Sequence, residues 1–479
     1  MKKLITYLLS CYIVFSIQFS YAQFGNLQNQ IKGAVKPTST NKASSSSGST
    51  NSNSSSNNNS SSTSSSNSSV PAAQGKDYYV SITRGKGKVA SKEEPAKDLG
   101  NIIAQLLPGD VIHIAEGTYL SRGEAGADEI GVPVTIIGGY DDNFTSRDPW
   151  GSHKTIFTGT NAISGSTQCR LKITANTDNS NVTVDGIVFD NGPRNRYKDA
   201  NKPYLILRTA DPNTGINATP ESGALYITCG KYCNIVVKNC VAINTAPTGG
   251  VISTMPGEAG KVTIENNLVV NNTGEGIFAM SGWHPRDNAN LPEYTIKNNT
   301  VLFCWKHDAI ATYGGNGLKL DTDVKIDAEN NVFGFGDYGG IDNIKLCKSV
   351  TLKNNLVLGN RQYDYREYNT AMKIDQIEDE ADQIQPTSTG NISKMVTIPV
   401  SKEWSTLYAN RKEVSRAQVD AAAKVSNSDA NAVRSILGLP LQAGSVAMDA
   451  DVWLHKIAIE DALKAGMQKY DGKFGCSKP

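Results

Sequence analysis

The sequence carries almost no net charge. Its 47 Lys and Arg residues are balanced by 46 Asp and Glu residues, so the formal charge of the 479-residue chain is +1. Proteins that bind nucleic acid or acidic surfaces usually carry an excess of basic residues. We therefore expect no nucleic-acid partner, and the composition does not indicate an oligomeric state.

Long apolar runs are also scarce, and the one that opens the chain, residues 4–19, is short and interrupted by polar residues. Lys2 and Lys3 precede it, and Ser20-Tyr21-Ala22 follows as a small-residue cleavage site. This order is typical of a secretory signal peptide over residues 1–22 rather than of a transmembrane helix. We expect an exported protein, in the periplasm, at the cell surface or outside the cell. No transmembrane span should remain after the signal is removed.

Aromatic residues make up only 7% of the chain, whereas Gly and Asn are plentiful. Asn and Gly tolerate the left-handed backbone conformation that tight turns require. The composition therefore favours an all-β body built from many short strands.

Cysteine is sparse, and the eight residues fall to seven once Cys11 is removed with the signal. An odd number leaves at least one thiol free or bonded to another chain. Cys229 and Cys233 are close enough in sequence to form a local disulfide in an oxidising compartment. A zinc site is the alternative, although no His lies near them in the sequence. Cys240 is expected to be a small residue packed in the core.

Residues 43–69 have no charge and no aromatic side chain, and are almost entirely Ser and Asn. Such a segment has too little apolar surface to become ordered. We therefore predict a disordered linker over residues 23–76, between the signal peptide and the folded body.

One short phrase recurs through the middle of the chain, for example Ile-Glu-Asn-Asn-Leu-Val at 264–269 and Leu-Lys-Asn-Asn-Leu-Val at 352–357. Its third position falls at Gly186, Asn239, Asn266, Asn298, Asn330 and Asn354, in steps of 53, 27, 32, 32 and 24 residues. A repeat of this length indicates a stacked array, because one unit cannot bury its own apolar face. We expect the Asn residues at the third position to stack as a hydrogen-bonded ladder.

The start of the body resembles a known family. Residues 97–107 have helical spacing and are followed by Pro-Gly-Asp-Val-Ile-His-Ile-Ala-Glu-Gly-Thr-Tyr at 108–119 and Ile-Ile-Gly-Gly-Tyr-Asp-Asp-Asn-Phe at 136–144. These motifs, with Arg147-Asp148-Pro149, resemble secreted bacterial right-handed parallel β-helix proteins of the pectin-lyase-like superfamily. The resemblance implies a three-sheet solenoid over residues 77–400, with the helix at 97–107 capping its first edge.

The pattern changes to helical after about Trp404. Short helices are predicted at 419–425, from Ser428 to Gly438, and at 452–465. We expect residues 401–479 to form a helical segment that packs on the solenoid or caps it.

A short four-residue segment lies nine or ten residues after each repeated Asn, and these segments are expected to stack on one another as a second column. It reads Thr-Gly-Gly-Val at 248–251, Gly-Glu-Gly-Ile at 274–277, His-Asp-Ala-Ile at 307–310 and Tyr-Gly-Gly-Ile at 338–341. In this register Glu275 stacks on Asp308, and acid, base and aromatic groups converge on one edge. General acid–base chemistry on a sugar needs such groups. The candidate catalytic residues are therefore Lys306, His307, Asp308, Glu275 and Tyr313.

Neighbouring side chains complete this predicted site. Aromatic rings can stack on a sugar, and basic side chains can bind its polar groups. The candidate substrate-binding residues are therefore Trp283, His284, Arg286, Trp305 and Tyr338. Two carboxylates one coil apart, Glu275 and Asp308, could hold Ca²⁺, although two carboxylates alone make a sparse site.

The sequence leaves the activity open. The paired Asp and Gly-His-Gly pattern of polygalacturonases and the Asp-Pro-His-Glu pattern of alginate epimerases are both missing, and no clear lyase signature is present. One hypothesis is a carbohydrate-active enzyme, specifically a polysaccharide lyase. The alternatives are a non-enzymatic surface or matrix protein that binds glycan, and a purely structural spacer.

Overall fold

The structure is a computed structural model. It describes residues 75–121, 126–159, 169–192, 223–245, 247, 249–284, 289–305, 314–336, 338–360, 362–393, 424–425, 446–447, 457–467 and 474–479. The predicted signal peptide and nearly all of the predicted linker lie outside these residues.

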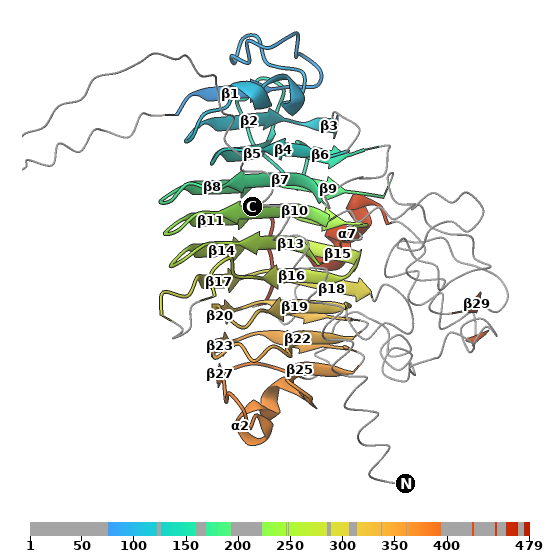
Figure 1. The fold of residues 1–479 in the computed structure, drawn as a ribbon. Coiled ribbons are helices and arrows are strands. Elements are labelled where there is room, and N and C mark those ends of the chain that lie inside the picture. Colours follow the sequence, from blue (N-terminus) through green and yellow to red (C-terminus); the bar gives the residue numbers. More distant parts are fainter. Residues whose placement is uncertain are drawn as a thin grey trace, which may run out of the picture. The chain divides into compact units, whose positions relative to one another are not determined.

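Three sheets make up the body (Figure 1). Sheet A contains β1 (Asp77–Val80), β2 (Val111–Ala115), β5 (Thr135–Tyr140), β8 (Asn181–Asp185), β11 (Asn234–Lys238), β14 (Lys261–Glu265), β17 (Glu293–Lys297), β20 (Lys325–Glu329), β23 (Ser349–Lys353) and β27 (Thr387–Thr389). Sheet B contains β3 (Gly117–Leu120), β6 (Thr155–Thr158), β9 (Ile187–Asp190), β12 (Val241–Ile243), β15 (Leu268–Thr273), β18 (Thr300–Trp305), β21 (Val332–Gly334) and β24 (Leu356–Leu358). Sheet C contains β4 (Asp128–Ile130), β7 (Cys169–Ala175), β10 (Gly223–Cys229), β13 (Gly250–Met255), β16 (Glu275–Ala279), β19 (Asn316–Leu320), β22 (Gly339–Asn343), β25 (Tyr363–Glu367) and β26 (Thr370–Met372).

The chain visits the sheets in the repeating order A, B, C, as in β14, β15 and β16. Each strand pairs in parallel with the equivalent strand of the next coil, and only the final pair of sheet C, β25 and β26, is antiparallel. Parallel strands joined by crossovers wind in the right-handed sense. The prediction of an all-β, right-handed parallel β-helix is confirmed.

Columns of apolar side chains fill the interior. On sheet A, one column in register runs through Val182, Ile235, Val262, Tyr294, Ile326 and Val350, all of them buried. Burial of such a side chain contributes about 1.5–3 kcal/mol. The Tyr294 hydroxyl is satisfied in the core by donating to the Thr254 and Met280 carbonyls at 2.8 and 2.6 Å. The alternation of buried and outward residues along each strand therefore produces one continuous core.

The repeated phrase marks the turn from sheet A to sheet B, and its third position has a positive φ of 50–72° in all six coils. The hydrogen-bonded amides are one residue later. Asn267 donates to Asn299, Asn299 to Asn331, Asn331 to Asn355 and Asn355 to Asn391, at 2.9–3.0 Å. At the third position Asn266 donates to Asn239 at 2.8 Å, but no such bond continues through Asn298, Asn330 and Asn354 in the described residues, so the prediction that these residues make the column is wrong. The third residue occupies the left-handed turn, and the fourth points into the core, where Cys240 begins the column by donating its backbone N–H to Asn267.

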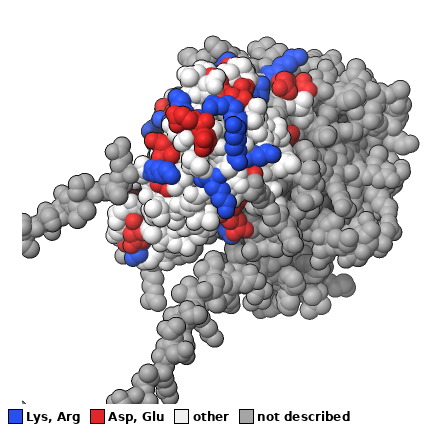
Figure 2. All heavy atoms as spheres, turned by 90° about the horizontal axis from the view of Figure 1, so that it is seen from above, with Lys and Arg blue, Asp and Glu red and all other residues white. Residues whose placement is uncertain are grey.

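The ends of the described stack are closed by short elements. The α-helix predicted at 97–107 is instead two consecutive 3-10 turns, η1 (Leu99–Asn101) and η2 (Ile103–Gln105). Leu99, Ile102 and Leu106, which lie in or beside these turns, are buried in the core. At the other end, η3 (Ile374–Gln376) and α2 (Ile377–Glu380) bury Ile374 and Ile377. Basic and acidic side chains lie next to one another on the face at the β1 end in Figure 2.

Helix α7 (Ile459–Gly466) packs on the outside of sheet B, against β15 and β18. A Cβ atom at Gly466 would lie 1.9 Å from a terminal methyl carbon of Leu268, so a larger residue there would force the Leu268 side chain to move. Of the helix predicted at 419–425, the last two residues instead form a two-residue strand, β28 (Lys424–Val425), paired with β29 (Val446–Ala447). No helix in the described part of the chain is long and apolar enough to cross a membrane.

Candidate functional site

The outer face of sheet C carries one side chain from each coil in a continuous register. This sheet C column consists of Glu129, Lys172, Tyr226, Ser253, Phe278, Lys319, Asp342 and Arg366. Each member precedes or follows a core residue, so the strand alternation directs it outward. Parallel strands lie ~4.8 Å apart, which places chemically different groups at a regular spacing along the stack.

Glu275 lies beside this column, but its neighbour in the next coil is Asn316 and not Asp308. Both the backbone N–H and the side-chain amide of Asn316 donate to Glu275 Oε2, at 3.2 and 2.9 Å. The predicted register fails because nine residues separate Asn266 from Glu275, whereas eighteen separate Asn298 from Asn316. The extra residues belong to an insertion before β19, so the count that located Glu275 does not transfer to this coil.

Lys319 supplies the positive charge next to Glu275. Its Nζ lies 3.2 Å from Glu275 Oε1 and 5.3 Å from the centre of the Phe278 ring. Burial acts to lower the pKa of Lys319, but the nearby carboxylates of Glu275 and Asp342 outweigh burial and raise it. Lys319 is therefore an ammonium at neutral pH and cannot act as a general base there.

A second ion pair lies one and two coils further on. The Arg366 Nε and one terminal nitrogen contact the same Asp342 oxygen at 3.0 and 2.9 Å. The other terminal nitrogen donates to the Tyr338 hydroxyl at 3.2 Å, and the guanidinium lies 4.9 Å from the Tyr338 ring centre. Asp342 is 1% exposed, so the ion pair holds Arg366 and Tyr338 in fixed positions.

Tyr363 joins the two ion pairs. Its hydroxyl donates to the Asn316 side-chain oxygen at 2.7 Å, and its ring packs edge-on against the Tyr338 ring. Burial raises the pKa of Tyr363 well above its usual value, so Tyr363 is a neutral hydrogen-bond donor. The polar network is thus a connected set of Glu275, Asn316, Lys319, Tyr338, Asp342, Tyr363 and Arg366 in which each cation has its own carboxylate.

The structure brings two of the predicted site residues into this network, Glu275 and Tyr338. Trp305 lies elsewhere, 2% exposed, with its indole N–H donating to Asn271 and its ring packed near Phe303. The prediction that Trp305 binds substrate is wrong, because a buried indole offers no face for a sugar.

Trp283 and His284 lie on the turn between sheets C and A, apart from the polar network. The Trp283 ring is half-buried with Lys231 Nζ 5.4 Å from its centre, and His284 Nδ1 lies 2.5 Å from Asp323. Substrate binding by these two residues stays a prediction. The other candidates, Lys306, His307, Asp308, Tyr313 and Arg286, lie outside the described residues.

Calcium binding by Glu275 and Asp308 stays a prediction, because Asp308 lies outside the described residues. Both Glu275 carboxylate oxygens already accept hydrogen bonds, and one of the donors is the Lys319 ammonium. Ca²⁺ prefers six to eight oxygen ligands. Within the described ranges, no three His, Cys, Asp or Glu side chains are grouped so that they could hold a metal ion.

Five members of the polar network were missed from the sequence: Asn316, Lys319, Asp342, Tyr363 and Arg366. The signal was present in the strand alternation. In Leu318-Lys319-Leu320 and Gly340-Ile341-Asp342 a charged residue occupies the outward place next to an inward apolar residue. Alignment of the strands on their inward residues, rather than on the preceding Asn, recovers the sheet C column.

Comparison with known proteins yields only distant likenesses. No family profile and no curated protein matches the sequence. Two solved structures are similar at 13% identity each. The pectin methylesterase PemA from Erwinia chrysanthemi matches over 72% of this chain and 95% of its own, with a TM-score of 0.34. The pectate lyase Pel9A matches over 62% of this chain and 66% of its own, with a TM-score of 0.25. The pairing of the three sheets in itself shows a right-handed parallel β-helix.

Proposed function

We propose that this protein is exported and binds a polysaccharide along the outer face of sheet C. The observation that carries the proposal is the sheet C column, which repeats at the coil spacing and mixes aromatic, hydroxyl and charged groups. A polymer of repeating sugars needs contacts at regular intervals. The exposed or partly exposed members of the column can supply them, whereas Ser253, Phe278 and Asp342 are buried: the accessible members are Glu129, Lys172, Tyr226, Lys319 and Arg366. Residues 1–22 support export by their sequence alone.

The exposed and buried members of the site have different roles in this proposal. Tyr226, Lys319, Tyr338 and Arg366 are partly exposed and make the sugar contacts. Buried carboxylates hold the two cations in place and neutralise them, so the surface recognises hydroxyl groups by hydrogen bonds and ring faces rather than by net charge. The whole-chain charge of +1 agrees with that mode of recognition.

Binding is tested with a panel of neutral and uronate polysaccharides by affinity electrophoresis and titration calorimetry. Arg366→Lys and Tyr338→Phe keep charge and ring size but remove the guanidinium fork and the hydroxyl. We expect each to weaken binding about tenfold, which is about 1.4 kcal/mol. The matched control is Lys353→Ala on sheet A, where Lys353 pairs with Asp327 at 3.7 Å, and it should bind as the wild type does. Equal binding by all variants would place the glycan elsewhere.

A second candidate function is a polysaccharide lyase acting on a uronate. It is favoured by one observation, the Tyr338 hydroxyl held against the Arg366 guanidinium, because lyase chemistry needs a base and a cation facing the substrate carboxylate. The test follows ultraviolet absorbance of unsaturated ends on uronate polysaccharides, with and without Ca²⁺. Loss of product in Tyr338→Phe supports the assignment. A protein that binds a uronate polymer but gives no unsaturated product is a binding protein and not a lyase.

A further inference from the structure

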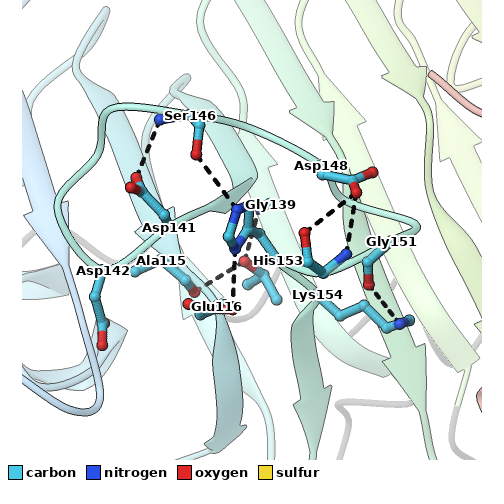
Figure 3. A network of polar contacts seen from close by, with 12 residues as sticks. Ala115, Glu116, Gly139, Asp141, Asp142, Ser146, Asp148, Gly151, His153 and Lys154 are labelled. Atoms are coloured by element: carbon cyan, nitrogen blue, oxygen red, sulfur yellow. Dashed lines mark hydrogen bonds and ion pairs between the residues drawn. The ribbon is translucent and has the colours of Figure 1, made fainter.

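Three side chains from two adjacent coils form a hydrogen-bonded row at the turn from sheet A to sheet B (Figure 3). The Ser146 Oγ lies 3.3 Å from His153 Nε2, and His153 Nδ1 lies 3.1 Å from Glu116 Oε2. Glu116 follows β2 in the first coil, and Ser146 and His153 belong to the loop between β5 and β6 in the second. This row lies at the A–B turn, whereas the polar network lies on sheet C.

The loop that carries Ser146 is tightly held. Asp141 accepts the backbone N–H groups of Thr145 and Ser146 at 2.6 and 3.1 Å, together with the Thr145 hydroxyl. Arg147 ties the loop to the sheet through the Gly138 carbonyl and Asp185, at 2.7 and 2.6 Å. The Ser146 side chain is nevertheless exposed, so a rigid backbone presents its hydroxyl to solvent.

The order of the three groups gives them distinct roles. With its proton on Nδ1, His153 donates to Glu116, and Nε2 is left to accept from the Ser146 hydroxyl. A nucleophile hydrogen-bonded to a base, with the base oriented by a carboxylate, is the arrangement that activates serine in acyl transfer. A separation of 3.3 Å between Oγ and Nε2 is within the range seen before substrate binds.

A hydrogen-bond donor for the developing oxyanion is also present. The backbone N–H of the residue after a serine nucleophile often fills that role. The N–H of Arg147 has no acceptor among the described residues, whereas its side chain points to Gly138 and Asp185. A tetrahedral oxyanion on Ser146 would find this free amide next to it.

We propose that Ser146, His153 and Glu116 form a catalytic relay that hydrolyses small acyl esters. Ser146 Oγ bonds to the ester carbonyl carbon as its proton passes to His153 Nε2. The carbon–oxygen bond to the alcohol then breaks, and the alcohol leaves with that proton. Water attacks the acyl group on Oγ, gives one proton to Nε2, and the carboxylic acid leaves as the proton returns to Oγ. Glu116 holds the imidazole and stabilises its charged form throughout.

The test uses the full chain, with p-nitrophenyl acetate as substrate and a fluorophosphonate as covalent probe. We expect the probe to label Ser146, as located by peptide mass spectrometry, and Ser146→Ala to abolish both labelling and turnover. His153→Ala should lower the acylation rate by about 100-fold or more. Ser152 is the matched control, because it is an exposed serine in the same loop that bonds to Asp148 instead, and Ser152→Ala should keep full activity.

Circular dichroism and the thermal midpoint verify that each variant is folded. A wild-type protein that is neither labelled nor active overturns the proposal. So does labelling that persists in Ser146→Ala, since it would come from another nucleophile. Glu116→Gln distinguishes a catalytic role of Glu116 from a merely structural one. A catalytic role predicts slower acylation with unchanged stability, whereas a structural role predicts lower stability with unchanged acylation.

Discussion

Ser477 and Asn266 exchange two hydrogen bonds across 211 positions of sequence. The Ser477 N–H donates to Asn266 Oδ1 at 2.8 Å, and Asn266 Nδ2 donates to the Ser477 carbonyl at 2.9 Å. Gly475 and Cys476 make similar contacts to the Asn330 carbonyl and the Thr300 hydroxyl, and Lys478 reaches Asp148. Segment 474–479 therefore runs against the order of the coils and ties several of them together at the A–B turn.

The first prediction concerns segment 474–479 and its hydrogen bonds to Asn266. Asn266→Gly keeps the positive φ that the turn needs and removes both hydrogen bonds to Ser477, together with the one that Asn266 donates to Asn239 at 2.8 Å. We expect the free energy of unfolding to fall by about 1–3 kcal/mol, because two exposed hydrogen bonds to Ser477 and a partly buried one to Asn239 are lost. Asn298→Gly is the control, since Asn298 has the same conformation and makes no side-chain hydrogen bond within the described chain. Equal thermal midpoints for the two variants would show that the contacts of segment 474–479 with Asn266 add no stability.

The second prediction concerns the buried amide column. Asn299 donates to the Ile264 and Lys297 carbonyls and to Asn331, and it accepts from Asn267. Asn299→Ala leaves several of these buried groups unsatisfied, so we expect a loss of about 3 kcal/mol or more in denaturant unfolding. The adjacent Asn298→Gly should cost far less. If the two changes cost the same, the amides at the fourth position do not stabilise the stack.

The third prediction concerns the Glu275–Lys319 pair. Lys319→Met leaves the buried Glu275 carboxylate without its cation, at a cost of about 3–5 kcal/mol, whereas Glu275→Gln leaves a partly exposed ammonium near Asp342 and should cost less. The double variant should cost less than the sum of the two, because no unpaired charge remains. Glu275→Gln should also lower the pKa of Lys319, since Glu275 contributes to raising it. Additive effects in the double-mutant cycle would show that the two groups do not interact.

The sequence located the A–B turns because a left-handed residue at a fixed place selects Gly or Asn. It could not distinguish the turn residue from the inward one in pairs such as Asn298-Asn299, where the two residues are identical. Cys240 carried the missing information: it takes the fourth place, and cysteine is among the most buried residue types.

The site was harder to predict than the fold. Glu275 and Tyr338 were found because the coils that contain them have the same spacing from the turn. Asp308 was aligned with Glu275 by that spacing, although the insertion before Asn316 had changed the register. Insertions in a solenoid go into its turns, so side chains on a sheet are aligned by strand alternation and not by counting from a distant turn.

The fourth prediction concerns the cysteines. Cys229 and Cys233 are both buried, and the hydrogen bond from Cys233 lowers the pKa of Cys229. We expect the exported protein, exposed to a disulfide oxidant, to join these two thiols. Thiol titration in denaturant should then give five free cysteines of the seven outside residues 1–22, and peptide mass spectrometry should find the Cys229–Cys233 link. Seven free thiols in a protein recovered from an oxidising compartment would contradict this expectation, and stoichiometric zinc would favour the metal alternative.

The fifth prediction concerns acid and the loop that carries Ser146. The hydroxyl of Thr145 and then the backbone N–H groups of Thr145 and Ser146 lower the pKa of Asp141 from 3.8 to about 2. A carboxyl group whose pKa is lower in the folded state stabilises the loop above the unfolded value and stops doing so as pH falls through the folded value. We therefore expect amide exchange in the peptide around Ser146 to rise, relative to the rest of the chain, as pH falls from about 4 to about 2.

In Asp141→Asn this local change with pH should disappear, because the ionisable group that holds the two amides is gone. Asp142→Asn is the matched control: Asp142 accepts from the Ser81 hydroxyl and does not bond the Ser146 amide, so the acid response should persist. Exchange is followed by mass spectrometry, with each pH corrected for the intrinsic exchange rate. An acid response that survives in Asp141→Asn would mean that another group holds the Ser146 loop in place.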